Sequence, residues 1–432
     1  MMEKMKPSGI AWIGDIPTGW KVKKIKYYTY IVNGSTPDSS DLNCWDGPIK
    51  WITPADMDNT GIIYEGERTL TQYGYNSCGT SMLPKGSVVV SSRAPIGKIN
   101  ITGDVLCTNQ GCKSLVGETD NRYLYYLLLA GQEELVRLGR GTTFVELSTH
   151  DLSNFGIVLP ESAERTAIAD FLDTQCTKID SVIADIEKQI ETLQKYKKSL
   201  ITEMVTKGLD RSVPMKDSGI EWIGEIPKHW GISKTRYLAN LCSGATPSKD
   251  VYSYWEGNIP WVSSQEVKTD IITDTSLHIS EESIHSCSTK LMPAGTLVMV
   301  VRSGILQHTI PVALLGVPAT INQDIKAFVF KAEMIPAYYK YYIQGENDAL
   351  LNVLIKDKTT VESIDNNLLL SLRIMVPPIQ EQKDIVSYLD ERCGKINSII
   401  ADKRAQLDTI IQHKKSLIYE YVTGKKRVTE VN

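Results

Sequence analysis

The chain has 432 residues, of which 42% are hydrophobic and 23% charged, and its formal net charge is −4. This length accommodates two domains, and the composition is typical of a soluble globular protein. The longest apolar runs, YLYYLLLA and GTLVMVV, are too short to cross a membrane, and the first nine residues lack the apolar core of a signal peptide.

Near its start the chain contains a motif that returns 210 positions later: SGIAWIGDIPTGW at residues 8–20 recurs as SGIEWIGEIPKHW at residues 218–230. The patterns G-x-T-P and W-x-G-x-I-x-W follow at the same offset. Further along, the second copy repeats an arginine, an Asn-Gln pair and the stretch GTTFVEL, which becomes KTTVESI. The offset drifts only to 217, so two copies of one unit account for nearly the whole chain.

Each copy begins with a region in which short β-branched and aromatic runs alternate with Gly, Pro, Asn and Asp. In the first copy the runs PIKWIT, GSVVVSS, KINITGDVLCT and KSLVG predict strands. Residues 120–139, DNRYLYYLLLAGQEELVRLG, have helical periodicity and predict one helix that ends at Gly139. This region is therefore predicted to be a mixed α/β domain that is mostly strand.

Each copy ends in a long stretch of different period. Residues 163–207 contain no Pro or Gly, and apolar residues recur at alternating spacings of three and four, the heptad pattern of a coiled coil. At a rise of about 1.5 Å per residue, each stretch predicts a helix of roughly 60 Å. The two helices either pair with each other, which we expect, or each pack on their own domain. The predicted seam comprises Leu172, Ile179, Ile183, Ile186, Ile190 and Leu193, with Leu389, Ile396, Ile400, Leu407 and Ile410 in the second helix.

The predicted fold is α+β, with two tandem mixed α/β domains that are each followed by a long helix. The expected boundaries are residues 1–160 for the first domain, 161–208 for the first helix, 209–217 for a linker, 218–377 for the second domain, 378–424 for the second helix and 425–432 for a tail.

A lysine interrupts the seam at equivalent places in the two helices, Lys197 and Lys414. A lysine at a core position of a coiled coil can fix the register of the pair. Alternatively, the seam shifts to Tyr196 and His413 while both lysines extend into solvent.

The sequence offers little for catalysis. It contains no phosphate-binding loop, no dinucleotide fingerprint and no hydrolase or zinc-protease motif. Asp250 and the stretch 266–268 imitate the spacing of a metal-dependent nuclease, but the first copy lacks the equivalent lysine. The eight cysteines form no C-x-x-C pair, so we expect free thiols in a reducing cytoplasm and no metal site.

The remaining polar loops are suited to binding, because they carry the residue types that contact bases and phosphates. Alternatively, the Asn-Gln pairs only satisfy the backbone of turns. The tryptophans at positions 12, 20, 222 and 230 are expected to anchor each domain's first segment to its core rather than to stack on bases. The predicted nucleic-acid contacts are Ser35, Thr36, Ser92, Arg93, Lys98, Asn109, Gln110, Thr246, Arg302, Ser303, Gln307, Asn322 and Gln323.

With the motifs SGIxWIGxIPxxW, G-x-T-P, W-x-G-x-I-x-W and NQ, the order of domain, helix, domain and helix resembles the specificity subunit of Type I restriction–modification systems. The strongest marker is VPPIQEQKDIVSYLD at residues 376–390, with a degenerate copy, LPESAERTAIADFLD, at residues 159–173. The resemblance covers essentially the whole chain. The first copy departs from the pattern at Glu161, where the second has Pro378.

This resemblance implies a DNA-binding subunit that is not itself catalytic. Each domain would be a target recognition domain for one half of a bipartite site in double-stranded DNA. The long helices would form an antiparallel coiled coil, and the halves would be related by pseudo-two-fold symmetry. Two modification subunits would dock on the chain and methylate adenine N6 with S-adenosylmethionine, and restriction subunits would join through them and use ATP and magnesium. The chain itself would bind no cofactor and no membrane.

Two other functions remain open at this point. The chain can be a fused or cryptic methyltransferase or nuclease, in which case it would act on DNA without partners. It can also be a structural coiled-coil adaptor that recognises no bases.

Overall fold

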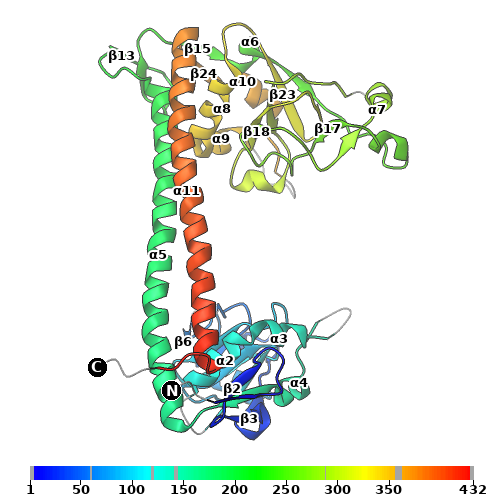
Figure 1. The fold of residues 1–432 in the computed structure, drawn as a ribbon. Coiled ribbons are helices and arrows are strands. Elements are labelled where there is room, and N and C mark those ends of the chain that lie inside the picture. The colour runs from blue at the N-terminus through cyan, green and yellow to red at the C-terminus, as the bar shows by residue number, and fades with distance from the viewer. Residues whose placement is uncertain are drawn as a thin grey trace. The chain divides into compact units, whose positions relative to one another are not determined.

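The computed structural model describes residues 4–58, 61–117, 121–140, 145–287, 289–355 and 362–428. The chain forms two compact units (Figure 1): unit 1 consists of residues up to Glu187 and from Ala405, and unit 2 of Lys188–Arg404. Two long helices, α5 (Ser162–Lys207) and α11 (Ile379–Val422), each begin in one unit and end in the other. Within the described ranges, no helix is both long enough and apolar enough to cross a membrane.

Unit 1 is built mainly from short strands. These are β1 (Met5–Pro7), β2 (Asp15–Pro17), β3 (Lys21–Lys24), β4 (Tyr30–Asn33), β5 (Trp45–Ile52), β6 (Ile62–Ile63), β7 (Thr69–Leu70), β8 (Val88–Ser91), β9 (Ile99–Thr102), β10 (Cys107–Thr108), β11 (Cys112–Val116) and β12 (Gly156–Leu159), with helices α1 (Gln72–Ser77), α2 (Arg122–Ala130), α3 (Gln132–Arg137) and α4 (Thr149–Asn154) and 3-10 turns η1 (Ile25–Tyr27) and η2 (Leu42–Cys44). The main sheet has the order β4-β11-β8-β9-β6, and a smaller one the order β10-β5-β7. The four predicted runs all form strands, but KINITGDVLCT forms two, β9 and β10, which belong to different sheets.

Unit 2 repeats the strands of this plan one for one. Its elements are β13 (Met215–Asp217), β14 (Glu225–Pro227), β15 (Gly231–Lys234), β16 (Ala239–Ser243), β17 (Ile259–Val262), β18 (Ile271–Ile272), β19 (His278–Ile279), β20 (Leu297–Val300), β21 (Val312–Leu315), β22 (Thr320–Ile321), β23 (Ile325–Phe330), β24 (Arg373–Val376), α6 (Thr235–Leu238), α7 (Glu281–Ser286), α8 (Pro336–Gly345), α9 (Asn347–Leu354), α10 (Asn366–Ser371), η3 (Tyr252–Trp255) and η4 (Gly304–Gln307). Its sheets have the orders β16-β23-β20-β21-β18 and β19-β17-β22. The matching orders confirm the tandem repeat.

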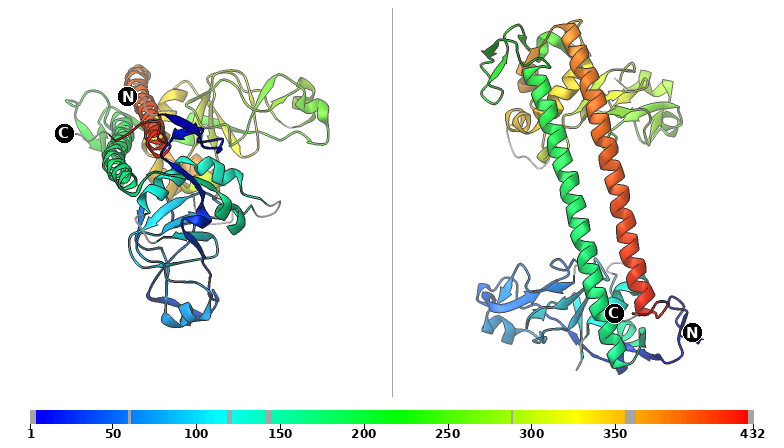
Figure 2. Two further views of the ribbon diagram at one scale, coloured as in Figure 1. Left: turned by 60° about the horizontal axis from the view of Figure 1, so that its bottom comes forward. Right: turned by 60° about the vertical axis from the view of Figure 1, so that its left-hand side comes forward.

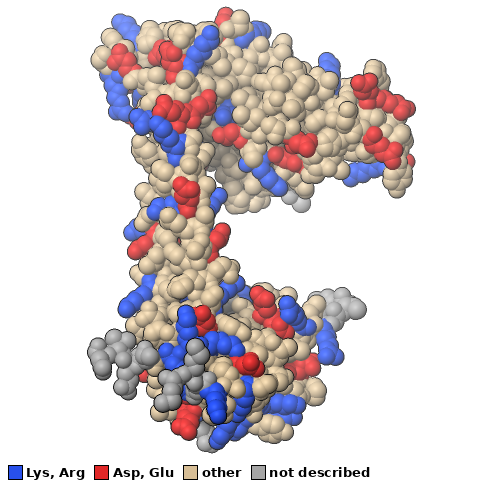
Figure 3. All heavy atoms as spheres, viewed as in Figure 1, with Lys and Arg blue, Asp and Glu red and all other residues tan. Residues whose placement is uncertain are grey.

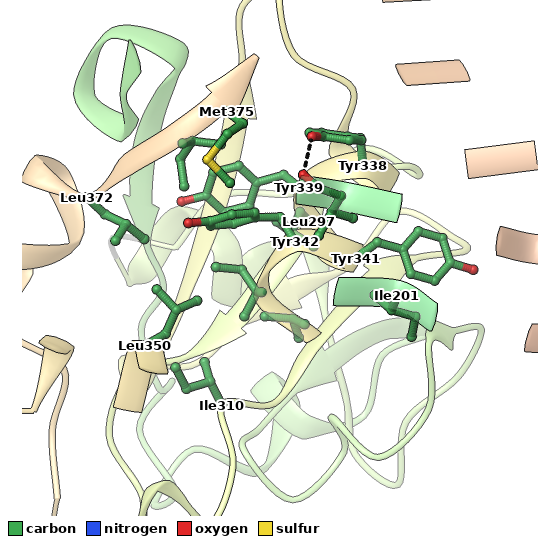
Figure 4. Close-up of a cluster of buried hydrophobic side chains, with 14 of the residues drawn as sticks. Ile201, Leu297, Ile310, Tyr338, Tyr339, Tyr341, Tyr342, Leu350, Leu372 and Met375 are labelled. Atoms are coloured by element: carbon green, nitrogen blue, oxygen red, sulfur yellow. Dashed lines mark hydrogen bonds between the residues drawn. The ribbon is translucent and has the colours of Figure 1, made fainter. Parts of the chain in front are cut away.

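The core of unit 2 is centred on the tyrosines of α8 (Figure 4). Tyr338 and Tyr342 are fully buried, among Leu297 of β20 and Met375 of β24. The Tyr338 hydroxyl donates to the carbonyl of Val205 in α5 at 3.0 Å. Unit 1 has the same contact at the other long helix, because the hydroxyl of Tyr123 in α2 donates to the carbonyl of Val422 in α11 at 2.9 Å.

The repeated opening motif receives the end of a long helix in each unit. In unit 1 the hydroxyl of Tyr419, in α11, donates to the carbonyl of Trp12 at 3.1 Å, and Lys425 donates to the carbonyl of Asp15. In unit 2, Lys207 at the end of α5 donates to the carbonyl of Ile223 at 3.2 Å. The motif therefore serves the structure of each unit.

The anchoring role predicted for the tryptophans is confirmed for Trp20 and Trp230, which are 2% and 1% exposed. Trp12 stacks on Phe155, with ring centroids 6.1 Å apart. The prediction is wrong for Trp222, which is 42% exposed. The position that matches Phe155 in the second copy is Leu372, which has no ring to hold the indole.

The single helix predicted over residues 120–139 is two helices, α2 and α3, which meet at Gly131. A Cβ atom at this position would lie 2.9 Å from the ring of Trp12. The helix therefore bends where the opening motif packs against it, and this tertiary contact is not visible in the periodicity.

Within unit 1 the first part of α5 packs antiparallel against the last part of α11 (Figure 2). The rings of Phe171 and Tyr421 lie 4.4 Å apart, and further along the pair Lys414 Nζ contacts Asp180 Oδ1 at 2.6 Å. Within unit 2, Lys197 Nζ of α5 donates to Asn397 Oδ1 of α11 at 2.9 Å. All predicted seam positions are buried or partly buried.

These contacts decide between the two alternatives for the seam lysines. Tyr196 is 58% exposed and His413 is exposed, so the seam does not shift to these residues. Lys197 and Lys414 instead contact the partner helix at equivalent positions, occupied by Asn397 and Asp180. That they fix the register stays a prediction.

A buried carboxylate lies where α8 meets α5. Glu346 is 6% exposed, and among the described residues its Oε1 has no hydrogen-bond partner. Burial raises the pKa of Glu346 from 4.5 to about 7, against the attraction of Lys198 and Lys207. The folded chain thus holds a proton that the unfolded chain has lost between these pH values, so stability falls as the pH rises through this window.

We expect Glu346→Gln to stabilise the protein by on the order of 2 kcal/mol at pH 8.5, where the wild type carries a buried charge, and to change little at pH 5. Calorimetric unfolding at the two pH values measures the difference. Glu187→Gln, on an exposed face of α5, is the control. An equal effect of Glu346→Gln at both pH values would contradict the assignment of the charge.

Candidate nucleic-acid interface

In each unit the loop that carries the G-x-T-P motif brings the predicted threonine together with the predicted Asn-Gln pair. In unit 1 this loop follows β4 and lies against residues 108–110: Ser35 N donates to Thr108 O at 2.9 Å. A Cβ atom at Gly34 would lie 2.1 Å from the carbonyl oxygen of Asn109, and one at Gly244 would lie 1.7 Å from that of Ile321. Only glycine permits this approach, which explains the first residue of the motif.

A tryptophan from the W-x-G-x-I-x-W motif holds the next residue of the loop. The indole Nε1 of Trp51, in β5, donates to Ser35 O at 3.1 Å, and that of Trp261, in β17, donates to Ala245 O at 3.1 Å. The last tryptophan of the motif thus ties the smaller sheet to the loop in both units.

The threonine of the loop holds the glutamine of the Asn-Gln pair. In unit 2 the Thr246 hydroxyl donates to Gln323 Oε1 at 2.6 Å, and in unit 1 Thr36 donates to Gln110 Oε1. Both glutamines are exposed. The same hydrogen bond therefore joins two distant parts of the chain in both units. Its partners are 74 positions apart in unit 1 and 77 positions apart in unit 2.

A lysine on the neighbouring strand completes the contacts. Lys113 Nζ, in β11, lies 3.5 Å from Asn33 Oδ1, and Lys326 Nζ, in β23, lies 2.5 Å from Ser243 Oγ. Both lysines follow the Asn-Gln pair at the same spacing, so they bring a positive charge beside each loop.

The asparagines of the two pairs have a structural role. Asn109 Oδ1 accepts from Gly111 N at 2.9 Å, and Asn322 Oδ1 accepts from Asp324 N at 3.0 Å. Asn322 is only 5% exposed, and Ser92 is fully buried, with its hydroxyl donating to Gly111 O. These side chains hold turns, so the proposal for base contacts moves to their exposed neighbours.

The predicted arginines are both exposed but have different surroundings. Arg93 Nε donates to Glu146 Oε2 at 3.2 Å, and the same carboxylate lies 3.6 Å from Lys113 Nζ. Among the residues that the structure describes, the Arg302 guanidinium has no ion-pair partner. Its backbone pairs with Ser363, just beyond the stretch 356–361 that lies outside the described residues.

The other predicted residues lie on the adjoining loops. Lys98 Nζ donates to Pro54 O at 3.0 Å. Ser303 Oγ caps η4, and Gln307 Nε2 donates to Glu362 Oε1 at 3.0 Å. Glu362 is 8% exposed and matches Val145 of the first copy, whereas the position of Glu146 is occupied by Ser363 in the second copy.

Sequence reasoning missed the residues that support the predicted ones. Repetition in the two copies was the available signal for two of them: the tryptophan ends a repeated motif, and the lysine follows the Asn-Gln pair at the same spacing. The glutamates lie one position apart in the aligned stretches GTTFVEL and KTTVESI, so repetition does not mark them. The missed residues are Trp51, Trp261, Lys113, Lys326, Glu146 and Glu362.

Two cysteines beside the site are not activated for catalysis. Burial raises the pKa of the Cys107 thiol to about 11 and that of Cys112 to about 12, so neither is a thiolate at neutral pH. Glu266, which belongs to the nuclease-like spacing in the sequence, has a structural contact, because its carboxylate accepts from the Ser276 hydroxyl. No three metal-ligating side chains come together in the part of the chain that the structure describes.

The surface charge of each unit is mixed on the face that Figure 3 shows. Acidic side chains gather at the α7 end of unit 2, where Glu281 and Glu282 begin the helix. Because phosphates are repelled from such a patch, the loops around Arg302 and Gln323 are the better candidate for contact with a nucleic acid.

Comparisons with known proteins agree with this duplicated arrangement. The sequence model of the family described as Type I restriction modification DNA specificity domain matches residues 17–192 and 227–409. The chain is 27% identical to the Type I restriction enzyme MjaIX specificity subunit of Methanocaldococcus jannaschii, over 97% of this chain and 96% of that protein. It is 26% identical to the Type I restriction enzyme EcoR124I/EcoR124II specificity subunit of Escherichia coli, over 83% of this chain and 86% of that protein.

A solved structure described as the basis of complex assembly and conformational transition of the type I R-M system has the same fold. Its TM-score is 0.71 at 15% identity, over 95% of this chain and 99% of that chain.

Proposed function

This chain belongs to the Type I restriction modification DNA specificity family, and we propose that it selects the DNA sequence on which a Type I restriction–modification complex acts. It is the non-catalytic subunit of that complex. Each target recognition domain binds one half of a bipartite site in double-stranded DNA. Because the loops of the two units differ in sequence, the two half-sites differ and the whole site is asymmetric.

The observation that carries this proposal is the duplication of the site. The family model matches each half of the chain once, and each half holds a Gly-x-Thr loop on an Asn-Gln turn by the same contacts. Two modules of one type in one chain suit a split recognition site, as the two subunits of a dimeric DNA-binding protein do.

The catalytic work is assigned to partner subunits. Modification subunits, two for each chain, dock on this chain and methylate adenine N6 with S-adenosylmethionine. Restriction subunits join through them and require ATP and magnesium. Partner subunits that cover part of the DNA backbone would also explain why this chain has no strong positive charge.

The test is to express the chain with its modification subunits in a host without other adenine methylation and to map N6-methyladenine across the genome. We expect one bipartite, asymmetric motif. Methylation by the purified chain alone would favour the cryptic methyltransferase, and methylation without a motif would favour the adaptor.

We expect Arg93→Ala and Arg302→Ala each to weaken binding of the cognate duplex by about 1–3 kcal/mol and to relax one position of one half-site. Fluorescence anisotropy of the assembled complex measures the affinity, and methylation mapping identifies the position. Arg404→Ala, on an exposed part of α11, is the control for loss of one positive charge. An unchanged affinity would remove that arginine from the interface.

A further inference from the structure

We propose that Gln110 and Gln323 donate their amide N–H groups to phosphates of the DNA backbone and so fix the position of each domain on the duplex, without recognising a base. This inference rests on the proposed function, because it assigns a role within the same interface.

The first argument is that the glutamine and its supports are identical in kind in the two units. In each, a threonine hydroxyl donates to the glutamine Oε1, a tryptophan indole holds the loop and a lysine stands beside it. The arginines, in contrast, differ, since Arg93 is paired with Glu146 while Arg302 has no ion-pair partner among the described residues. An arrangement common to both units cannot distinguish two different half-sites, and the feature that all half-sites share is the sugar–phosphate backbone.

The second argument concerns the orientation of the amide. A glutamine that recognises adenine uses its oxygen as acceptor and its nitrogen as donor at the same time. Here the oxygens of Gln110 and Gln323 already accept from Thr36 and Thr246. Among the described residues neither amide nitrogen has a partner. Each glutamine is therefore held as a donor, and phosphate oxygens are acceptors only.

The third argument is electrostatic. In unit 1 Arg93 and Lys113 share the carboxylate of Glu146, and the loop itself also carries the carboxylate of Asp38. In unit 2 the nearby cations are Lys326 and Arg302, while the carboxylates of Asp324 and Glu362 accept from Asn322 and Gln307. Charge around the loops is therefore mixed, and the feature that favours an anion in both units is the lysine bonded to the loop, Lys113 through Asn33 and Lys326 through Ser243.

DNA is favoured over a partner protein as the occupant. The contacting groups are an exposed amide, glycines and hydroxyls, which bind phosphates well. The centre of a protein–protein interface is instead rich in buried apolar and aromatic side chains, and the described side chains that hold these two loops offer no such exposed surface, since Trp51 and Trp261 are 4% and 7% exposed.

The experiment uses Gln110→Glu and Gln323→Glu in the assembled complex. The substitution keeps an oxygen that accepts from the threonine, so the loop is retained, but it replaces the amide donor by a negative charge. Gln412→Glu, on an exposed face of α11, controls for the added charge. Affinities are measured on the cognate duplex and on a duplex with both half-sites scrambled, and the methylated motif is mapped for each variant.

We expect each variant to bind both duplexes about ten-fold more weakly, with the ratio of the two affinities and the motif unchanged. A changed base in the motif would overturn the proposal by showing a base contact. An unchanged affinity would show that the glutamines only support the loop, and weaker binding of modification subunits without DNA would show a protein contact. A wild-type complex without a motif would refute the proposed function instead, and the scrambled duplex would still test the glutamines.

Discussion

Replacing residues 8–160 by the corresponding domain of a specificity subunit with another target is expected to change one half of the methylated motif completely and to leave the other half unchanged. Unit 1 contains its own loop, Asn-Gln turn and arginine, and the contacts described above that hold this loop come from residues of unit 1. Because the second domain is not altered, its half-site is retained. Mapping N6-methyladenine before and after the exchange measures both halves in one experiment.

The junctions of this exchange need care, because the opening motif also binds the end of α11. A second chimera that keeps residues 8–24 and exchanges residues 25–160 preserves the contacts of Trp12 and Asp15 with Tyr419 and Lys425. The reciprocal exchange of residues 218–377 is the matched control and should change only the other half-site. An unchanged motif in an assembled, active chimera would favour the structural adaptor.

Lengthening both long helices by one heptad is expected to increase the spacer between the half-sites by up to about three base pairs. Seven residues add about 10.5 Å to a helix, and B-DNA rises about 3.4 Å per base pair along a strand. A whole heptad also keeps the apolar positions on one face of the helix. The insertions belong between Glu187 and Lys188 and between Arg404 and Ala405, where each helix passes from one unit to the other.

An insertion in α5 alone is the control for this design. It would move Lys197 and the following seam residues out of step with α11, so we expect loss of assembly rather than a new spacer. Size-exclusion chromatography with the modification subunits separates these results. If the paired insertion assembles and methylates the original motif with its original spacer, the helices do not determine the spacing.

The features of the fold that depend on local pattern could be predicted from the sequence. The repeat, the strands and the long helices follow from period and motif, and the seam follows from heptads. The break at Gly131 and the exposure of Trp222 could not, because both depend on which ring lies opposite. The parallel pairing of β5 with β10 and of β17 with β22 joins strands far apart in the chain, and no local pattern encodes it.

The sequence could locate the candidate site, but it could not show which side chains of the site contact each other or which of them are buried. Thr36 and Gln110 were identified because both belong to repeated motifs, yet their hydrogen bond spans 74 positions. Ser92 and Asn322 carry suitable side chains but are buried, and residue type alone does not show this. Trp51 and Lys113 were not predicted as site residues. A tryptophan in a strand is usually explained by packing in the core, and a lysine by contact with solvent.

The division of the chain has a consequence for the order in which the ribosome allows the protein to fold. Unit 2 is one continuous stretch, Lys188–Arg404, whereas unit 1 also needs the residues from Ala405 onward. The core of unit 1 includes Ile418 and Val422 of α11, which are synthesised after the whole of unit 2. Unit 1 therefore begins to leave the ribosome first but completes its fold second. Until the last part of α11 has been synthesised, the apolar surface of unit 1 lacks the helix that covers it.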